Sequence, residues 1–216
     1  MNRPRVCILL CAFFAFTSVS WGATIWIEGE QPASNRTTRH PWWYDKVKTE
    51  ELSGGDFISN WDKDKAGELE YRVDAAAAGN YEFWVRANPI QAAMTYSING
   101  STSVPIAVNR NEQSINIAAD DKPDMRFIAW VKVGNVSLKQ GTNTVKFTMT
   151  STNNHHGMLD CFVLSTEPFQ PNGKLKPGEG APAQEGKWFA FNPPPDNFAE
   201  SAIDLRSLNE KFAGEL

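Results

Sequence analysis

The chain has 216 residues, and its 21 basic against 25 acidic side chains give a net charge of −4. Nucleic acids and anionic membranes attract basic surfaces, so this balance disfavours both as partners. The length is sufficient for a domain that buries a core of its own.

The first residues have the layout of a secretory signal peptide. Arg3 and Arg5 precede an apolar run over residues 6–16, and small residues follow as far as Gly22. The run is too short for a membrane-spanning helix, so we expect no membrane span here. We expect residues 1–22 to be removed and the protein to be secreted, to the periplasm or the extracellular medium. Loss of the two arginines lowers the net charge to −6.

Removal of this leader also removes Cys7 and Cys11, which leaves Cys161. A single cysteine cannot form an intrachain disulfide, even in an oxidising compartment. Its neighbours, LDCFVL, predict a buried thiol that packs as a small hydrophobic group. An exported domain without disulfides needs a substantial core or a metal ion for its stability.

The mature sequence opens on a strand-like stretch, TIWIEGEQP, over residues 24–32. Side chains alternate along a strand, so Glu28 and Glu30 are expected on one face, the face of Trp26. A buried strand rarely carries two carboxylates on one face, because an unpaired buried charge is costly. Three interpretations are open at this point: a solvated edge, a catalytic pair, or two ligands of a metal ion.

Beyond this stretch the hydrophobic period is two, which indicates strands and not helices. Turn signals such as Asn99-Gly100 and Gly134-Asn135 separate the strand-like runs. These runs lie at residues 68–73, 80–87, 94–98, 127–133, 135–138, 144–150 and 158–164. Many short strands with this spacing predict an all-β fold, a β-sandwich jelly roll over residues 24–166.

The composition changes after the last predicted strand. Residues 167–197 are rich in Pro and Gly and lack apolar periodicity, so we expect a linker. Residues 198–216 carry apolar side chains at helical spacing and predict a short helix, either the start of a further domain or a helix that folds back on the sandwich.

Four segments, in this order, resemble carbohydrate-binding modules of families 6 and 35. They are IWIEGEQP for the first strand, ISNWDKDKAGELEYRVDAAAAGNYEFWVRA for the central hairpin, GNVSLKQGTNTVKFTM for the penultimate hairpin and GMLDCFVLS for the closing strand. The resemblance implies a jelly roll that binds polysaccharide. The tail, from FQPNGKLKP to DLRSLNEKFAGEL, resembles the lead-in to a glycoside-hydrolase-type barrel, which implies a catalytic domain after it.

The resemblance also implies a structural calcium ion, Ca2+, held by two first-strand glutamates and a last-strand aspartate. In this sequence they are Glu28, Glu30 and Asp160. Ca²⁺ takes several hard oxygen ligands, and the first and last strands of a jelly roll can be neighbours. A solvated edge is the alternative. A catalytic pair is disfavoured because glycosidase carboxylates flank a cleft from different elements, so we assign no catalytic residues.

Sugars are bound by aromatic faces together with amides and carboxylates, and two loops offer aromatic candidates. The first, RHPWWYDK, carries Trp42, Trp43 and Tyr44, and neighbouring residues of an extended backbone cannot all face one core. The second, SNWDKDKAG, carries Trp61. The alternative for both loops is a hydrophobic plug. Trp84 and Trp130 lie inside regular strands and are expected in the core.

Polar candidates come from the resemblance, which places a sugar-bonding asparagine in the loop before the last strand. That loop reads STNNHHG, and its four candidates are Asn153, Asn154, His155 and His156. The alternative is a polar loop without a binding role.

Together these observations predict a secreted, non-enzymatic, calcium-stabilised sandwich that binds a polysaccharide or other glycan and holds an appended enzyme near its substrate. The alternative is a structural module that docks on a neighbouring domain and binds no sugar.

Overall fold

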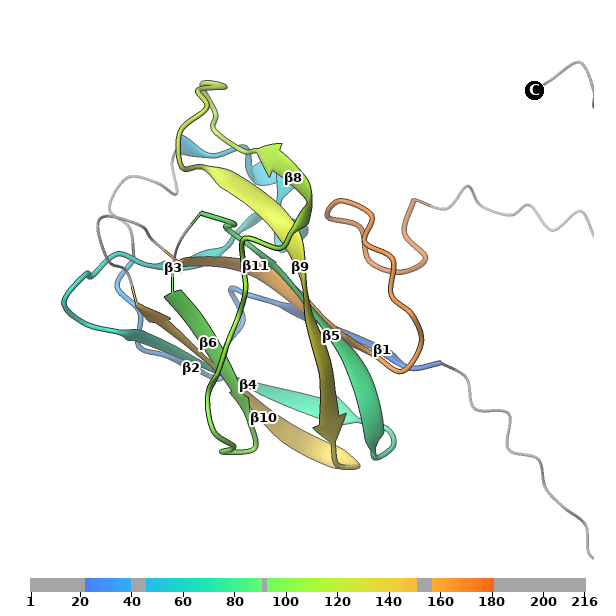
Figure 1. Ribbon diagram of the computed structural model, residues 1–216. Coiled ribbons are helices and arrows are strands. Elements are labelled where there is room, and N and C mark those ends of the chain that lie inside the picture. The colour runs from blue at the N-terminus through green and yellow to red at the C-terminus, as the bar shows by residue number, and fades with distance from the viewer. Residues whose placement is uncertain (1–21, 40–45, 91–92, 151–156, 181–216) are drawn as a thin grey trace, which may run out of the picture. The chain divides into compact units, whose positions relative to one another are not determined.

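Two antiparallel sheets form the computed structural model, which describes residues 22–39, 46–90, 93–150 and 157–180 (Figure 1). The six-stranded sheet runs β1-β11-β5-β9-β8, with β3 paired to β11, and the five-stranded sheet runs β2-β4-β10-β6-β7. In the six-stranded sheet the bounds are β1 Thr24–Glu28, β3 Ile58–Asn60, β5 Gly79–Ala87, β8 Glu112–Asn116, β9 Phe127–Leu138 and β11 Gly157–Ser165. In the five-stranded sheet they are β2 Ser34–Asn35, β4 Gly67–Ala75, β6 Ala93–Ile98, β7 Val104–Pro105 and β10 Gly141–Thr150.

This architecture confirms the predicted all-β sandwich. The turn predicted at Gly134-Asn135 is wrong, because β9 runs through both residues as one strand. Gly134 has a φ of 134°, and the pairing of β9 with β5 shifts register at this point. A glycine at a bulge therefore gives the same sequence signal as a glycine at a turn.

The core lies between the sheets and is rich in aromatic rings. Tyr71, Phe83, Phe147 and Phe162 are at most 1% exposed and meet mainly edge to face, with Tyr71 and Phe162 centroids 5.0 Å apart. Alternate side chains of β4 and β10 enter this core, as the period of two predicts. In the described part of the chain, no helix is long and apolar enough to cross a membrane.

The first and last strands are neighbours, and their pairing positions the candidate metal ligands. In the antiparallel register, Glu28 stands opposite Cys161, whose thiol is buried as predicted. Just past the strand, the Gly29 amide donates to the Asp160 carbonyl at 2.6 Å. A Cβ at residue 29 would lie 2.6 Å from the Leu159 carbonyl oxygen, so only glycine permits this approach.

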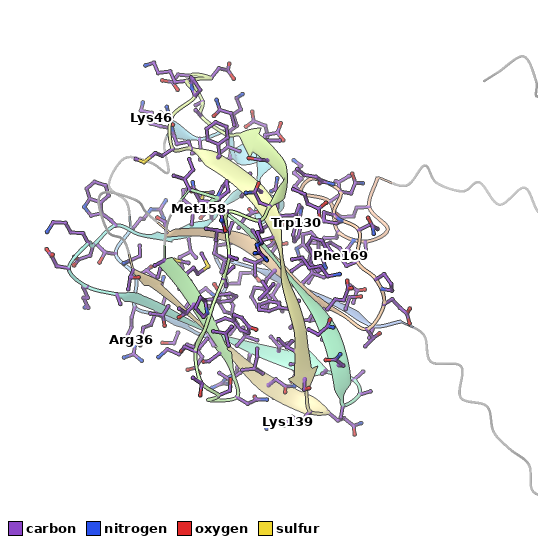
Figure 2. The ribbon with its side chains drawn as sticks, in the orientation of Figure 1. Arg36, Lys46, Trp130, Lys139, Met158 and Phe169 are labelled. Carbon is purple, nitrogen blue, oxygen red and sulfur yellow. The ribbon has the colours of Figure 1, made fainter. Side chains whose placement is uncertain are left out.

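After β11 the chain turns back and covers the outer face of the six-stranded sheet. We call residues 166–179 the strap. Phe169 on the strap packs against Trp26, Trp84 and Trp130, with a centroid distance of 5.3 Å to Trp130 (Figure 2). Trp130 Nε1 also donates to the Gly173 carbonyl at 2.8 Å.

These contacts make the strap a third layer of the fold. Trp84 and Trp130 are buried, as predicted, but beneath the strap and not between the sheets. The domain boundary near residue 166 and the linker to residue 197 remain predictions, and the helix predicted at 198–216 lies outside the described residues.

Candidate functional site

The three predicted metal ligands lie around residues 49–55, which form two short 3-10 helices, η2 Thr49–Glu51 and η3 Ser53–Gly55, and which we call the 49–55 loop. Asp160 belongs to β11 at a register shift between Leu159 and Cys161, so it is the extra residue of a bulge facing β5. Its carboxylate is completely buried, and Glu28 is 8% exposed. Because Asp160 has no pairing partner in the β11–β5 ladder, its side chain is directed toward the 49–55 loop.

Glu30 reaches the same site by another route than the one predicted. β1 ends at Glu28, so Glu30 lies in the following turn and not on the strand. A Cβ on Gly54 would lie 2.6 Å from Glu30 Oε1 and 3.5 Å from Glu28 Cδ. Gly54 has a φ of 64°, so glycine both permits the backbone conformation and leaves room for the two carboxylates.

Asp160 is held by two partners that the sequence analysis did not assign. The Ser53 amide donates to Oδ1 at 3.0 Å, and Arg86 Nη1 donates to Oδ2 at 2.7 Å. Arg86 is 1% exposed and also donates to the Glu51 carbonyl at 2.9 Å. Arg86 belongs to the largely apolar run YEFWVRA. A cationic residue in such a strand was the sequence feature that could have indicated a buried partner for Asp160.

The two glutamates have oxygens without hydrogen-bond partners. Both oxygens of Glu28 and Oε2 of Glu30 are buried and accept no hydrogen bond from the described residues. Lys176 of the strap lies 2.8 Å from Glu28 Oε1, an ion pair whose geometry is not that of a hydrogen bond. Buried carboxylate oxygens in this state are costly unless a cation or a proton satisfies them.

The pKa values of Glu30 and Asp160 are both raised, as expected for buried carboxyl groups with few hydrogen-bond donors. Burial, with smaller contributions from Glu28 and Asp160, raises the pKa of Glu30 to about 7, although a backbone hydrogen bond opposes the rise. Burial likewise raises the pKa of Asp160 to about 6, against the lowering effect of Arg86. Glu30 and Asp160 therefore keep their protons to a higher pH than exposed carboxyl groups do.

Three carboxylates face two cationic side chains here, and hard oxygens are the ligands that Ca²⁺ prefers. Glu28 Oε2 and Glu30 Oε2, which have no hydrogen bond, fit such an ion, while Glu28 Oε1 is paired with Lys176 and Asp160 with Arg86 and Ser53. Within the described ranges, no three His, Cys, Asp or Glu side chains are close enough to form a complete ligand set. A cation here would need backbone carbonyls or water as well.

Of the predicted sugar-binding residues, the structure describes Trp61 alone. Trp42, Trp43 and Tyr44, and likewise Asn153, Asn154, His155 and His156, lie outside the described residues. Trp61 is half-buried at the start of the loop after β3, and its amide donates to the Thr38 carbonyl at 2.7 Å.

Neighbouring contacts show which segments lead into this loop. Asn60 fixes it by donating from Nδ2 to the Asp62 and Lys65 carbonyls and accepting at Oδ1 from the Thr38 amide. Asn60 also pairs with Gly157 across the β3–β11 ladder. Thr38 and Gly157 stand two residues and one residue from the undescribed segments 40–45 and 151–156. The described residues that flank the loops RHPWWYDK and STNNHHG therefore contact Asn60 and its neighbour Trp61.

No protein-family model matches the sequence, and a search of curated proteins finds no relative. Among solved structures, the family 35 carbohydrate-binding module of Cellvibrio japonicus Abf62 is 13% identical with a TM-score of 0.43, over 66% of this chain and 92% of that one. The C-terminal family 6 module of the laminarinase LamC from Zobellia galactanivorans is 13% identical with a TM-score of 0.42, over 66% and 99%. The GH26-CBM35 β-(1,4)-mannanase of Podospora anserina is 15% identical with a TM-score of 0.45, and this chain spans 29% of its length. These likenesses are distant and concern the sandwich fold alone.

Proposed function

We propose that the protein is a secreted, non-catalytic glycan-binding jelly roll, stabilised by calcium, that holds an appended enzyme near its substrate. The observation that supports this proposal is the grouping of Glu28, Glu30 and Asp160 around residues 49–55, with Glu28 and Asp160 buried and Glu30 partly buried. The sequence resemblance implied this set, and its members come from opposite ends of the domain.

In this proposal Glu28 and Glu30 would hold the calcium ion, with Asp160 beside them. When bound, the ion supplies positive charge to carboxylate oxygens that lack a hydrogen-bond donor, Glu28 Oε2 and Glu30 Oε2 among them. Glu28 stands at the end of β1, Asp160 lies on β11, and Ser53 ties the 49–55 loop to Asp160. The site therefore links the two terminal strands to the loop that covers them.

Glycan binding would take place where Asn60 and Trp61 meet the flanks of the two candidate loops. A half-buried tryptophan can present one ring face to a sugar while its other face packs on protein. Lys65 in the same loop is exposed and offers an ammonium group to sugar hydroxyls, whereas the Asp62 carboxylate already accepts from the Asp64 and Lys65 amides. A flexible connection to an enzyme would then raise the effective concentration of its substrate.

The test is a glycan and polysaccharide array probed with the full chain in calcium-containing buffer. We expect binding to a polysaccharide that falls about five- to twelvefold in Trp61→Ala, because loss of a stacking face costs about 1–1.5 kcal/mol. Trp61→Phe is the matched control, since it keeps an aromatic face. Melting temperatures check that both variants fold. No binding to plant, algal or microbial glycans by the folded protein would overturn the proposal.

A second candidate is a structural module that joins its neighbour without binding sugar. The strap favours it, because residues after the last strand pack firmly on the sheet and give the following chain a fixed point of departure. This candidate predicts a calcium-dependent melting temperature together with an array that stays blank.

A further inference from the structure

Two lysines of the strap point toward the 49–55 loop, and they end on different groups. Lys174 Nζ donates to the backbone carbonyl of Glu50. Lys176 Nζ instead lies 2.8 Å from Glu28 Oε1, and the Glu28 side chain is only 9% exposed. The strap therefore brings a charge of the same sign as a metal ion to a carboxylate of the candidate calcium site.

The strap holds Lys176 in this position through its own turn. The Lys176 amide donates to Glu179 Oε2 at 3.0 Å, and the Glu179 amide donates to the Lys176 carbonyl at 2.9 Å. These hydrogen bonds hold the backbone of Lys176 where its side chain reaches Glu28.

The rest of the strap is anchored independently of the carboxylates. Phe169 packs on the three tryptophans, and Gly173 is bonded through its carbonyl to Trp130 and through its amide to Gln113 Oε1 at 2.9 Å. Residues 174–179 follow this anchored part in the sequence. They lie beside a cavity of about 450 Å³ between the strap and the 49–55 loop. The aromatic contacts of the strap therefore do not involve residues 174–179.

We infer that Lys176 and a divalent cation compete for Glu28, so that cation binding and docking of residues 174–179 oppose each other. The inference rests on the calcium site of the proposed function. A cation within 2.3–2.6 Å of Glu28 oxygens would stand close to the ammonium, and the two like charges would repel. The Lys176 side chain is 44% exposed, so water screens part of this repulsion. The cation replaces the charge that Lys176 supplies in its absence.

Such a coupling acts in both directions. If calcium weakens docking of residues 174–179 by a given factor, release of these residues strengthens calcium binding by the same factor. A domain or partner that draws the chain away from the site after Glu179 would therefore tighten the metal. Calcium occupancy and the release of residues 174–179 from the site would therefore rise and fall together.

The experiment compares Lys176→Met with Lys174→Met in the full chain. Calorimetric titration with Ca²⁺ is expected to give about tenfold tighter binding for Lys176→Met, within the usual range of such couplings, and a change below twofold for Lys174→Met. Both variants remove a strap lysine beside the same loop, but only Lys176 contacts Glu28. Amide exchange of residues 174–179, read by mass spectrometry, is expected to accelerate with Ca²⁺ in the unsubstituted protein and to be insensitive to Ca²⁺ in Lys176→Met.

Calcium binding of equal strength in the unsubstituted protein and both variants would overturn the competition while leaving the calcium site in place. Slower amide exchange of residues 174–179 with Ca²⁺ would also overturn it, since the metal would then fasten the strap. Absence of calcium binding in all three proteins would remove the metal site itself, and the competition with it.

Discussion

Replacing Arg86 by methionine is expected to lower the free energy of unfolding by about 3–5 kcal/mol, the usual cost of removing one partner of a buried ion pair. Asp160 is completely buried, and Arg86 Nη1 at 2.7 Å is its cationic partner. Methionine replaces the aliphatic stem of arginine but not its guanidinium, and leaves the carboxylate with the Ser53 amide and the weak Cys161 thiol donor. Urea denaturation at pH 7.5 in EDTA measures the loss.

Arg36→Met is the matched control for this substitution. Arg36 pairs with Glu68 at 3.3 Å, but its side chain is 69% exposed, so its loss should cost less than about 1 kcal/mol. Combining Arg86→Met with Asp160→Asn removes the uncompensated charge and should recover part of the stability. A loss below about 1 kcal/mol in Arg86→Met would mean that Asp160 does not depend on the guanidinium.

Calcium is expected to offset part of a loss of stability that occurs as the pH rises from about 5 to about 8. In EDTA the melting temperature should fall as the pH rises through this range. The pKa values of Glu30 and Asp160 are raised to about 7 and about 6, so the folded protein holds protons that the unfolded chain has released. The unfolded state therefore binds fewer protons, and stability decreases with pH. Asp120, whose pKa is lowered to about 2, acts only at lower pH.

Calcium at 100 times its dissociation constant should add about 2.7 kcal/mol, or roughly 5–10 °C, at pH 8. The gain should shrink toward pH 5, because the ion binds deprotonated carboxylates and competes with protons. Scanning fluorimetry across pH, with Ca²⁺ or EDTA, measures both trends. Glu30→Gln should reduce both, whereas Glu70→Gln, a half-buried carboxylate on β4, should leave them intact. A melting temperature indifferent to Ca²⁺ and EDTA at every pH would exclude a calcium site.

Much of the sandwich could be predicted because alternation along a strand is a local property. β4, β5, β6, β10 and β11 lie within a few residues of the predicted runs. The short strands β2, β3, β7 and β8 were not predicted, since two to five residues carry too little periodicity. Gly134 misled the prediction because a bulge and a turn both favour glycine.

The candidate site was predictable in its acidic residues and not in its cationic ones. Glu28 and Asp160 are conspicuous in apolar strands, and Glu30 follows at close spacing. The pairing of Arg86 with Asp160 depends on strand order, which no local pattern contains. Lys176 lies in a segment whose composition indicates a linker, and its contact with Glu28 arises only when the strap folds back.

The strap also determines where the protein can be divided. A fragment that ends with β11 at Ser165 would leave Trp26, Trp84 and Trp130 without Phe169, as a contiguous aromatic patch in water. Patches of this kind promote self-association and poor solubility. The smallest soluble fragment for biophysical work therefore extends beyond the last strand, at least to Glu179. Low solubility of a shorter fragment would result from the missing strap and would not mean that the sandwich is unstable.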